Sequence, residues 1–153
     1  MHEEFVPGLR YRSAAQELWA LVIESFAGWE DRINEASADA GLSPVSAWAL
    51  VQLDPDHAIS QKELAARLHC NPSTVVDPTD RLEEGGLVVR RPLPADRRIN
   101  TLAVTAKGRQ VRQALVQRLF DPPDAFRRLP AADQDRFRDA MLAAVGRMKP
   151  KGK

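Results

Sequence analysis

SQKELAARLHCNPSTVVDPTDRLEEGG, residues 60–86, contains the signals of two short helices in succession. Its first four residues predict a capping box, in which the Ser60 hydroxyl accepts from the Glu63 N–H and the Glu63 carboxylate reaches back to the Ser60 N–H. The first helix stops near His69–Cys70, and Asn71–Pro72 supplies a cap and a first-position proline for the next. Two short helices joined by a tight turn predict a helix-turn-helix motif.

The second helix contains an unexpected proline. Pro78 follows Pro72 by six residues, and an interior proline removes a helical hydrogen bond at a cost of roughly 3 kcal/mol. Either the helix is continuous from Pro72 and kinked at Pro78, or it restarts with Asp77 as a new cap. We favour the kink, because Val75 and Leu82 occupy packing positions of one continuous helix.

A β-hairpin is predicted after the second helix. LVVRR (87–91) is β-branched, and INTLAV (99–104) alternates apolar and polar residues, as expected of a returning strand. The turn-rich segment PLPADRR (92–98) forms a tip that carries arginines. Together with the two helices, this hairpin makes a winged helix-turn-helix.

Amphipathic helical segments flank the winged motif. Apolar residues recur at helical spacing over about 12–39 and 106–150, the latter interrupted by DPP at 121–123. Both segments carry more apolar surface than a small winged domain can cover, so we expect dimerisation helices; the alternative is that they fold back on their own domain. The predicted fold is therefore mainly α: one domain over 1–153, with a winged helix-turn-helix over about 42–106 and one β-hairpin wing.

Composition indicates a soluble globular protein. The 153 residues are 28% charged and 44% hydrophobic, and the formal net charge is +1. The single cysteine, Cys70, excludes an intrachain disulfide and the cysteine-rich zinc patterns. The N-terminal sequence lacks the apolar segment of a signal peptide, and no apolar run approaches the ~20 residues that span a bilayer. We expect a cytoplasmic protein with no membrane association and no cofactor.

Charge is distributed unevenly along the chain. Residues 81–112 contain eight basic and three acidic residues, a net charge of +5, which leaves −4 for the remainder. A basic segment of this size is a weak indication of nucleic-acid binding, and a solvated surface is the ordinary alternative.

From Leu42 to about Leu119 the sequence resembles the multiple antibiotic resistance regulator (MarR) family of bacterial transcription factors. The resemblance implies a winged-helix homodimer on pseudo-palindromic double-stranded DNA, usually a repressor that releases DNA when a small molecule or an oxidant acts. The matching segments are LSP (42–44), SQKELAARL (60–68), PSTV (72–75), DRLEEGGLVVRRP (80–92), DRR (96–98) and LAVTAKG (102–108).

The resemblance also implies roles for residues of the two helices. The second helix would enter a major groove and present four side chains to base edges, namely Ser73, Thr74, Val76 and Asp77. Gln61 would bond a phosphate through its side chain or backbone N–H. Arg81 would contact a phosphate or form a salt bridge with Glu84 or Asp80.

In the wing, the family pattern corresponds to Asp96 and Arg98. The Arg98 guanidinium would enter a narrow A·T-rich minor groove, where the negative potential is strongest, and Asp96 would hold it in place. Arg97 would meet a phosphate. The alternative for these residues is an ordinary polar hairpin tip.

Asp77 and Pro78 depart from the family pattern, which usually has a polar or basic residue followed by an aliphatic one. Asp77 cannot donate to guanine, but it can accept a hydrogen bond from the N4 amine of cytosine. We therefore expect this chain to read a different half-site from its arginine-bearing relatives. The alternative is that the change only weakens DNA binding, or leaves a winged-helix module that binds other proteins.

Other chemistry receives less support from the sequence. Trp19, Trp29 and Trp48 could line a pocket for a small aromatic or phenolic effector, although core packing is the simpler role. Cys70 could sense oxidants, or be a small buried apolar residue. No metal site is expected, and no nucleophile–base pattern accompanies the three histidines, so we expect no enzymatic activity.

Overall fold

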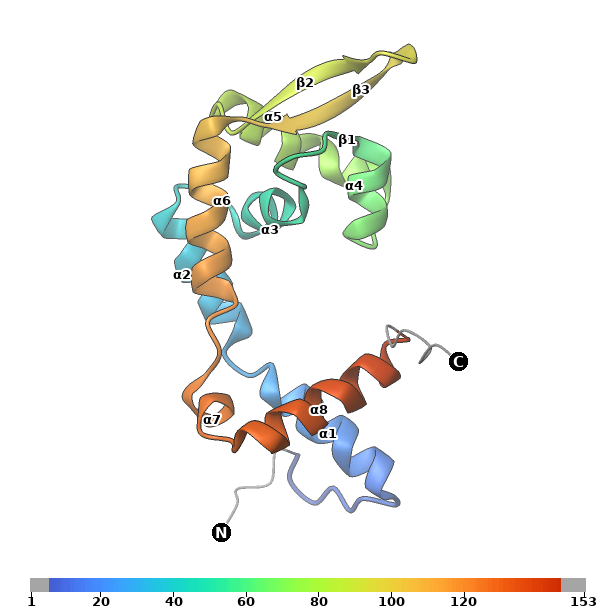
Figure 1. Ribbon diagram of the computed structural model, residues 1–153, viewed down its shortest axis with the longest axis vertical. Helices are drawn as coiled ribbons and strands as arrows, with labels where there is room; N and C mark the ends of the chain where they lie inside the picture. Colours follow the sequence, from blue (N-terminus) through green and yellow to red (C-terminus); the bar gives the residue numbers. More distant parts are fainter. Residues whose placement is uncertain (1–5, 147–153) are drawn as a thin grey trace. The chain divides into compact units, whose positions relative to one another are not determined.

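The computed structural model describes residues 6–146, which divide into two units, one ending at Leu119 and one beginning at Phe120. The architecture is mainly helical with a small antiparallel sheet, which confirms the predicted fold class (Figure 1). The elements of the first unit are α1 Ala14–Ser25, α2 Trp29–Asp39, α3 Pro44–Gln52, β1 Ile59–Ser60, α4 Gln61–Arg67, η1 Pro72–Val75, α5 Val76–Glu84, β2 Val88–Leu93, β3 Asp96–Val104 and α6 Ala106–Leu119.

The capping box at the start of α4 is confirmed. The Glu63 N–H donates to Ser60 Oγ at 3.2 Å, and the Ser60 N–H donates to Glu63 Oε2 at 2.7 Å. The turn after α4 passes through His69, whose φ of 53° is left-handed. This turn packs η1 against α4 and completes the helix-turn-helix.

The helix that contains Pro78 is built in two parts, so neither arrangement expected from the sequence is correct. Pro72–Val75 forms the 3₁₀ helix η1, and α5 begins at Val76 without a side-chain cap. Pro78 is the third residue of α5, where a backbone N–H has no intrahelical partner in any case. Asp77 therefore lies inside the first turn rather than capping it, and the proline costs no mid-helix hydrogen bond.

The wing is an antiparallel hairpin of β2 and β3, to which β1 adds a short third strand in the order β1-β3-β2. Leu102 of β3 is paired with Ile59 of β1 on one side and with Arg90 of β2 on the other. The strand β3 begins at Asp96, three residues before the predicted start, so it includes the arginines of the tip. In Figure 1 the hairpin projects beyond α4 and α5.

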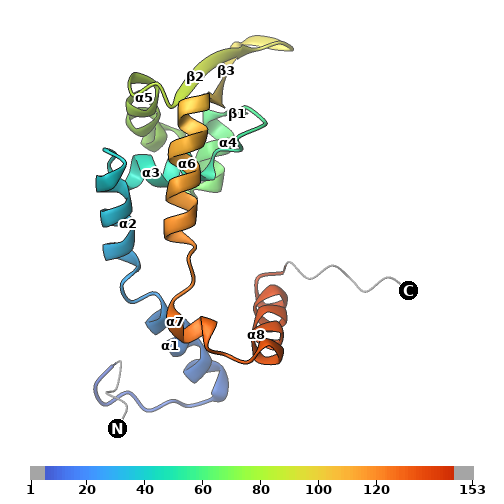
Figure 2. The ribbon, with the colours of Figure 1, turned by 60° about the vertical axis from the view of Figure 1, so that its left-hand side comes forward.

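The start of α6 docks tightly on the end of α5. The Gly108 N–H donates to Thr105 Oγ1 at 3.0 Å, and that hydroxyl donates to the Gly86 carbonyl at 2.6 Å. A Cβ atom at Gly108 would lie 1.9 Å from the Leu87 carbonyl oxygen, so only glycine permits this approach. Farther along, α6 runs beside α2 (Figure 2).

The core of the first unit lies within the winged domain. Leu50 and Leu53 from the α3 region meet Leu64 of α4 and Leu82 of α5, and each is at most 1% exposed. Val88 and Leu102 close this core from the sheet. The wing and the second helix of the helix-turn-helix, η1 with α5, are therefore held on one common core. We refer to η1 and α5 as the recognition helix.

The predicted helical segment over 12–39 is interrupted in the structure. Gly28, with φ 82°, separates α1 from α2. Only Ala20 of α1 is buried. Five large apolar residues of α1 and its C-cap are between 43% and 63% exposed: Leu18, Trp19, Leu21, Ile23 and Phe26.

The second unit contains α7 Asp124–Arg127 and α8 Ala131–Ala144. The predicted break at 121–123 is confirmed, but the short α7 was not expected. Phe126 and Phe137 pack edge to face with ring centroids 6.1 Å apart. The part of the predicted helical segment beyond residue 146 lies outside the described residues.

Candidate nucleic-acid interface

The outward face of η1 and α5 carries all four side chains predicted to face base edges. Ser73, Thr74, Val76 and Asp77 are exposed. Val75, Pro78, Thr79 and Leu82 point inward and are buried. The arrangement follows from helical periodicity, because residues on opposite sides of one short helix separate into a packed face and a free face.

Arg81 forms a salt bridge on this outward face, but with a partner that the sequence did not indicate. Its Nε donates to Asp77 Oδ2 at 3.0 Å, rather than to Glu84 or Asp80 as expected. This hydrogen bond raises the pKa of the Arg81 guanidinium above its usual value. The two side chains meet because residues four apart are neighbours on a helix.

Gln61 is engaged inside the protein. Its Nε2 donates to Thr79 Oγ1 at 2.8 Å, which joins the start of α4 to α5. This bond uses one of the two hydrogens on Nε2, so the second can still donate to a phosphate, and the expected contact stays a prediction. The backbone N–H of Gln61, in the first turn of α4, also suits a phosphate.

A buried polar network connects the recognition helix to the wing, and the sequence analysis missed it. Thr79 is fully buried; its hydroxyl accepts from Arg90 Nη2 at 3.1 Å and donates to the Val75 carbonyl at 2.8 Å. Arg90, from β2, also pairs with Asp80 and Glu83. Partial burial lowers the pKa of Arg90, but the hydrogen bonds to the two carboxylates outweigh it and the pKa is raised.

A signal for this network was present in the sequence. Arg90 and Arg91 follow the apolar residues at the start of this strand, and the acids of DRLEE precede them on the helix. What the sequence did not show is that the strand places Arg90 against that helix.

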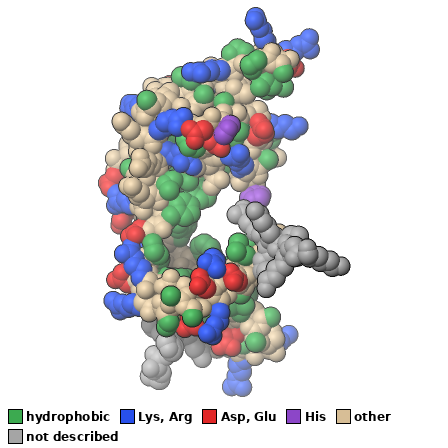
Figure 3. Space-filling view, in the orientation of Figure 1, with side chains coloured by type: hydrophobic (Ala, Val, Ile, Leu, Met, Phe, Trp, Pro, Cys, Tyr) green, Lys and Arg blue, Asp and Glu red, His purple; other side chains and the backbone are tan. Residues whose placement is uncertain are grey.

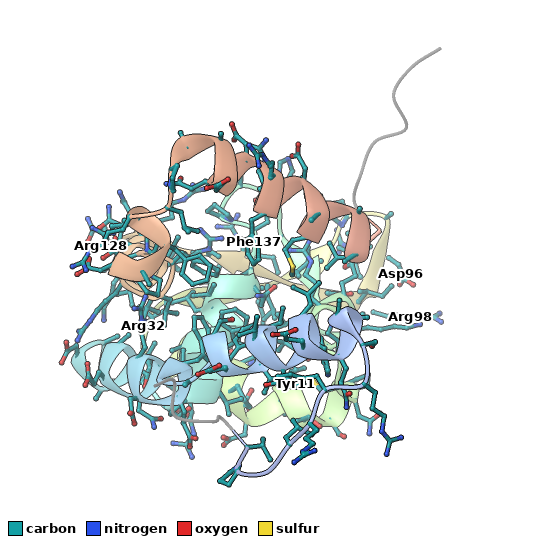
Figure 4. All side chains as sticks on the ribbon, turned by 90° about the horizontal axis from the view of Figure 1, so that it is seen from below. Tyr11, Arg32, Asp96, Arg98, Arg128 and Phe137 are labelled. Atoms are coloured by element: carbon teal, nitrogen blue, oxygen red, sulfur yellow. The ribbon has the colours of Figure 1, made fainter. Side chains whose placement is uncertain are left out.

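The wing tip carries Arg97 and Arg98, both exposed. Figure 4 shows Arg98 and Asp96 at this tip. Asp96 accepts a hydrogen bond from the backbone N–H of Arg98 at 3.0 Å. The carboxylate thus orders the backbone of the tip, and the Arg98 side chain extends outward; that Asp96 holds the Arg98 guanidinium on DNA stays a prediction. Figure 3 shows Lys and Arg side chains at the end of the wing.

The three tryptophans do not form one pocket. Trp29 and Trp48 pack edge to face at 5.8 Å against the core, whereas Trp19 lies on α1 and is 63% exposed. Trp48 does line a cavity of about 300 Å³, with Leu68, Cys70 and Val75. A second cavity of about 320 Å³ lies between α2 and α6.

Residues 6–146 contain further polar or reactive side chains that the sequence singles out. Asp54 accepts from the backbone N–H groups of Asp56 and His57, as a polar turn does, and these bonds lower its pKa. In this part of the chain no three potential metal ligands come together. Cys70 is half-buried in the turn after α4. Among the described helices, none is long and apolar enough to cross a bilayer.

Comparison with known proteins gives a consistent result. The MarR family model matches residues 42–99. The HTH-type transcriptional repressor MdtR of Bacillus subtilis (strain 168) is 31% identical over 74 residues, which cover 48% of this chain and 48% of that repressor. The match therefore spans about half the length of this curated relative.

Solved structures of similar fold cover more of the chain. CouR from Rhodococcus jostii RHA1, bound to p-coumaroyl-CoA, matches with a TM-score of 0.66 and 26% identity over 92% of this chain and all of that one. CouR bound to a 23-mer DNA duplex matches with a TM-score of 0.64 and 27% identity, over 91% and 99%. BldR from Sulfolobus solfataricus, at 20% identity and a TM-score of 0.70, has the same fold. Over residues 42–99 the winged helix-turn-helix of this chain matches the MarR family, and the solved MarR-type structures share its fold.

Proposed function

We propose that this protein is a sequence-specific DNA-binding repressor that acts as a homodimer on a pseudo-palindromic operator. The observation that carries the proposal is the pair of exposed surfaces on one core: the outward face of η1 and α5, and the arginine-bearing wing tip. A helix and a β-ribbon of this kind suit a major groove and its flanking minor groove. The similarity to the transcriptional repressor MdtR and to the DNA complex of CouR supports the same assignment.

The dimer would form through the terminal helices. The apolar side chains of α1 are largely exposed, including Trp19 and Phe26 at 63% each. An apolar surface of this extent on a regulator is typical of a subunit interface. A second copy of the chain is the occupant that a palindromic site requires, because operator symmetry mirrors protein symmetry.

The effector would be a small aromatic or phenolic molecule. The cavity beside Trp48 has apolar walls and is bounded by Val75 and Thr74 of the recognition helix. A molecule bound there would therefore contact that helix. Ligand-induced quenching of Trp48 fluorescence would support this site, provided that a Trp48→Phe variant loses the signal. Quenching that persists in the variant would assign the effector elsewhere.

Fluorescence anisotropy with the DNA upstream of the protein's own gene tests the function. We expect binding at least ~10³-fold tighter than to a scrambled duplex at physiological salt. Binding that is equal on both duplexes and disappears with salt would contradict sequence-specific regulation from that site, because it reports phosphate contacts alone. Such a result would favour a winged-helix module with weakened DNA reading.

A further inference from the structure

The Asp77–Arg81 ion pair lies on the exposed face of α5, where the proposed function brings the helix against DNA. Arg81 Nε and Asp77 Oδ2 are 3.0 Å apart, and the two side chains are 62% and 74% exposed. Helical side chains lean toward the N-terminus, so the pair holds the Arg81 guanidinium over the first turn of α5. That turn also carries Val76, and Ser73 and Thr74 come just before it, so the pair shares the N-terminal part of this helix with the expected base-reading residues.

The Asp77–Arg81 pair still has free donors on the arginine and a free acceptor on the aspartate, lying side by side. The bond to Asp77 occupies Nε of Arg81; among the described residues, neither its Nη groups nor Asp77 Oδ1 has a hydrogen-bond partner. Nε is thereby fixed, and the pair displays guanidinium donors beside a carboxylate acceptor. In the major groove a G·C pair displays the complementary order: the N7 and O6 acceptors of guanine, then the N4 amine of cytosine.

Charge argues against a phosphate contact at this place. Asp77 and Arg81 cancel each other, and Glu84 also interacts with Arg81. All three line an open hollow of about 580 Å³ beside the start of α3, so this surface is neutral to acidic. Phosphate contacts gain free energy by replacing condensed cations, which a neutral pair cannot do.

We propose that Asp77 and Arg81 act as one unit that reads a G·C base pair in each half-site. Arg81 donates to guanine N7 and O6, and Asp77 accepts from the cytosine N4 amine. The inference rests on the proposed DNA binding and adds the base pair that it recognises. The aspartate thus has two tasks: it orients the arginine and it recognises the partner base.

Selection from a randomised duplex library, followed by sequencing, tests the inference on the full-length protein. We expect the wild type to enrich a G·C pair at one position per half-site. Arg81→Ala, Asp77→Ala and Arg81→Lys should each lose that preference by roughly 5- to 100-fold, since lysine lacks the planar fork of arginine. The double variant should lose little more than either single variant, because the two residues act as a unit.

The matched control is Asp124→Ala/Arg128→Ala, which removes an exposed pair of the same i,i+4 spacing from α7. It should leave the selected sequence unchanged. Circular dichroism of every variant establishes that the helices are intact. The slope of binding affinity against salt should also stay unchanged in Asp77→Ala/Arg81→Ala and fall by about one in Arg97→Ala, if only the latter residue contacts a phosphate.

Two results would overturn the inference without touching the proposed function. One is an unchanged G·C preference in Arg81→Ala; the other is uniformly weaker binding with a reduced salt slope, which would make Arg81 a phosphate contact. If the wild type enriches no sequence at all, the proposed function itself fails, and the inference with it. These outcomes are distinguishable because the wild type and the variants are selected in parallel.

Discussion

The helices α1 and α3 have similarly apolar sequences but opposite surroundings. In α3 five of nine residues are buried, and Leu50 has no exposed surface. In α1 one of twelve is buried, and Leu21 is 53% exposed. The apolar residues of a helix thus indicate how much surface must be shielded from water. They do not indicate whether the helix's own domain or another chain shields it. The winged domain closes its own core, whereas α1 leaves most of its apolar surface exposed, and the proposed dimer would cover that surface.

Leucine-to-alanine substitutions in α3 and α1 should give the largest difference in the free energy of unfolding. Leu50→Ala should lower the free energy of unfolding by about 2–5 kcal/mol at every protein concentration, because it opens a cavity in a closed core. Leu21→Ala, measured in dilute protein, should change it by less than about 0.5 kcal/mol. Denaturant unfolding of both variants checks this. Equal losses in dilute protein would mean that α1 is packed within its own chain.

Trp19→Glu should separate the two subunits while leaving the winged domain folded. A buried tryptophan at the centre of an interface contributes about 2–4 kcal/mol to association. Sedimentation velocity should therefore show a monomer at concentrations where the wild type is a dimer. Gln16→Glu adds the same charge at an exposed position of α1 and serves as the control. A dimeric Trp19→Glu protein would place the interface elsewhere.

Gly108→Ala tests the closure of the winged domain at its edge. Alanine normally stabilises a helix relative to glycine, by up to ~1 kcal/mol. Here its Cβ would lie 1.9 Å from the Leu87 carbonyl oxygen, so we expect a loss of about 1–3 kcal/mol instead. Thermal unfolding at two protein concentrations measures it, with the exposed Gln110→Ala as control. Any gain in stability would show that α6 does not dock as closely as described.

Glu63→Gln should change the free energy of unfolding least, and the size of the change should depend on pH. The hydrogen bonds from Ser60, the backbone N–H first, lower the pKa of Glu63 in the folded state. A lowered pKa stabilises the fold above the unfolded value of about 4.3, and this contribution is lost as pH falls through the folded pKa. The variant should therefore be less stable than the wild type at pH 7 and approach it in acid. A constant difference between pH 7 and pH 3 would exclude a charged capping box.

Local signals in the sequence were sufficient for several helix starts. Ser43 with Pro44, Ser60 with Glu63, and Thr105 each mark a helix start that the structure retains, because the hydrogen bonds involved span three or four residues. The β-hairpin was also predictable, from the alternation of apolar and polar residues in its second strand. The strand β1 was missed because its two residues carry no pattern of their own and pair with Leu102 and Thr101 of β3, far along the chain.

The candidate site was predicted as a set of residues but not as an arrangement. The sequence by itself determined the helix-turn-helix, the wing and the outward face of the recognition helix, since these follow from periodicity and caps. Tertiary structure decided that Gln61 bonds Thr79, that Arg90 fastens the wing to the recognition helix, and that Asp96 bonds backbone rather than guanidinium. Such contacts join residues far apart in sequence or choose among several donors within reach, and only the packed fold makes that choice.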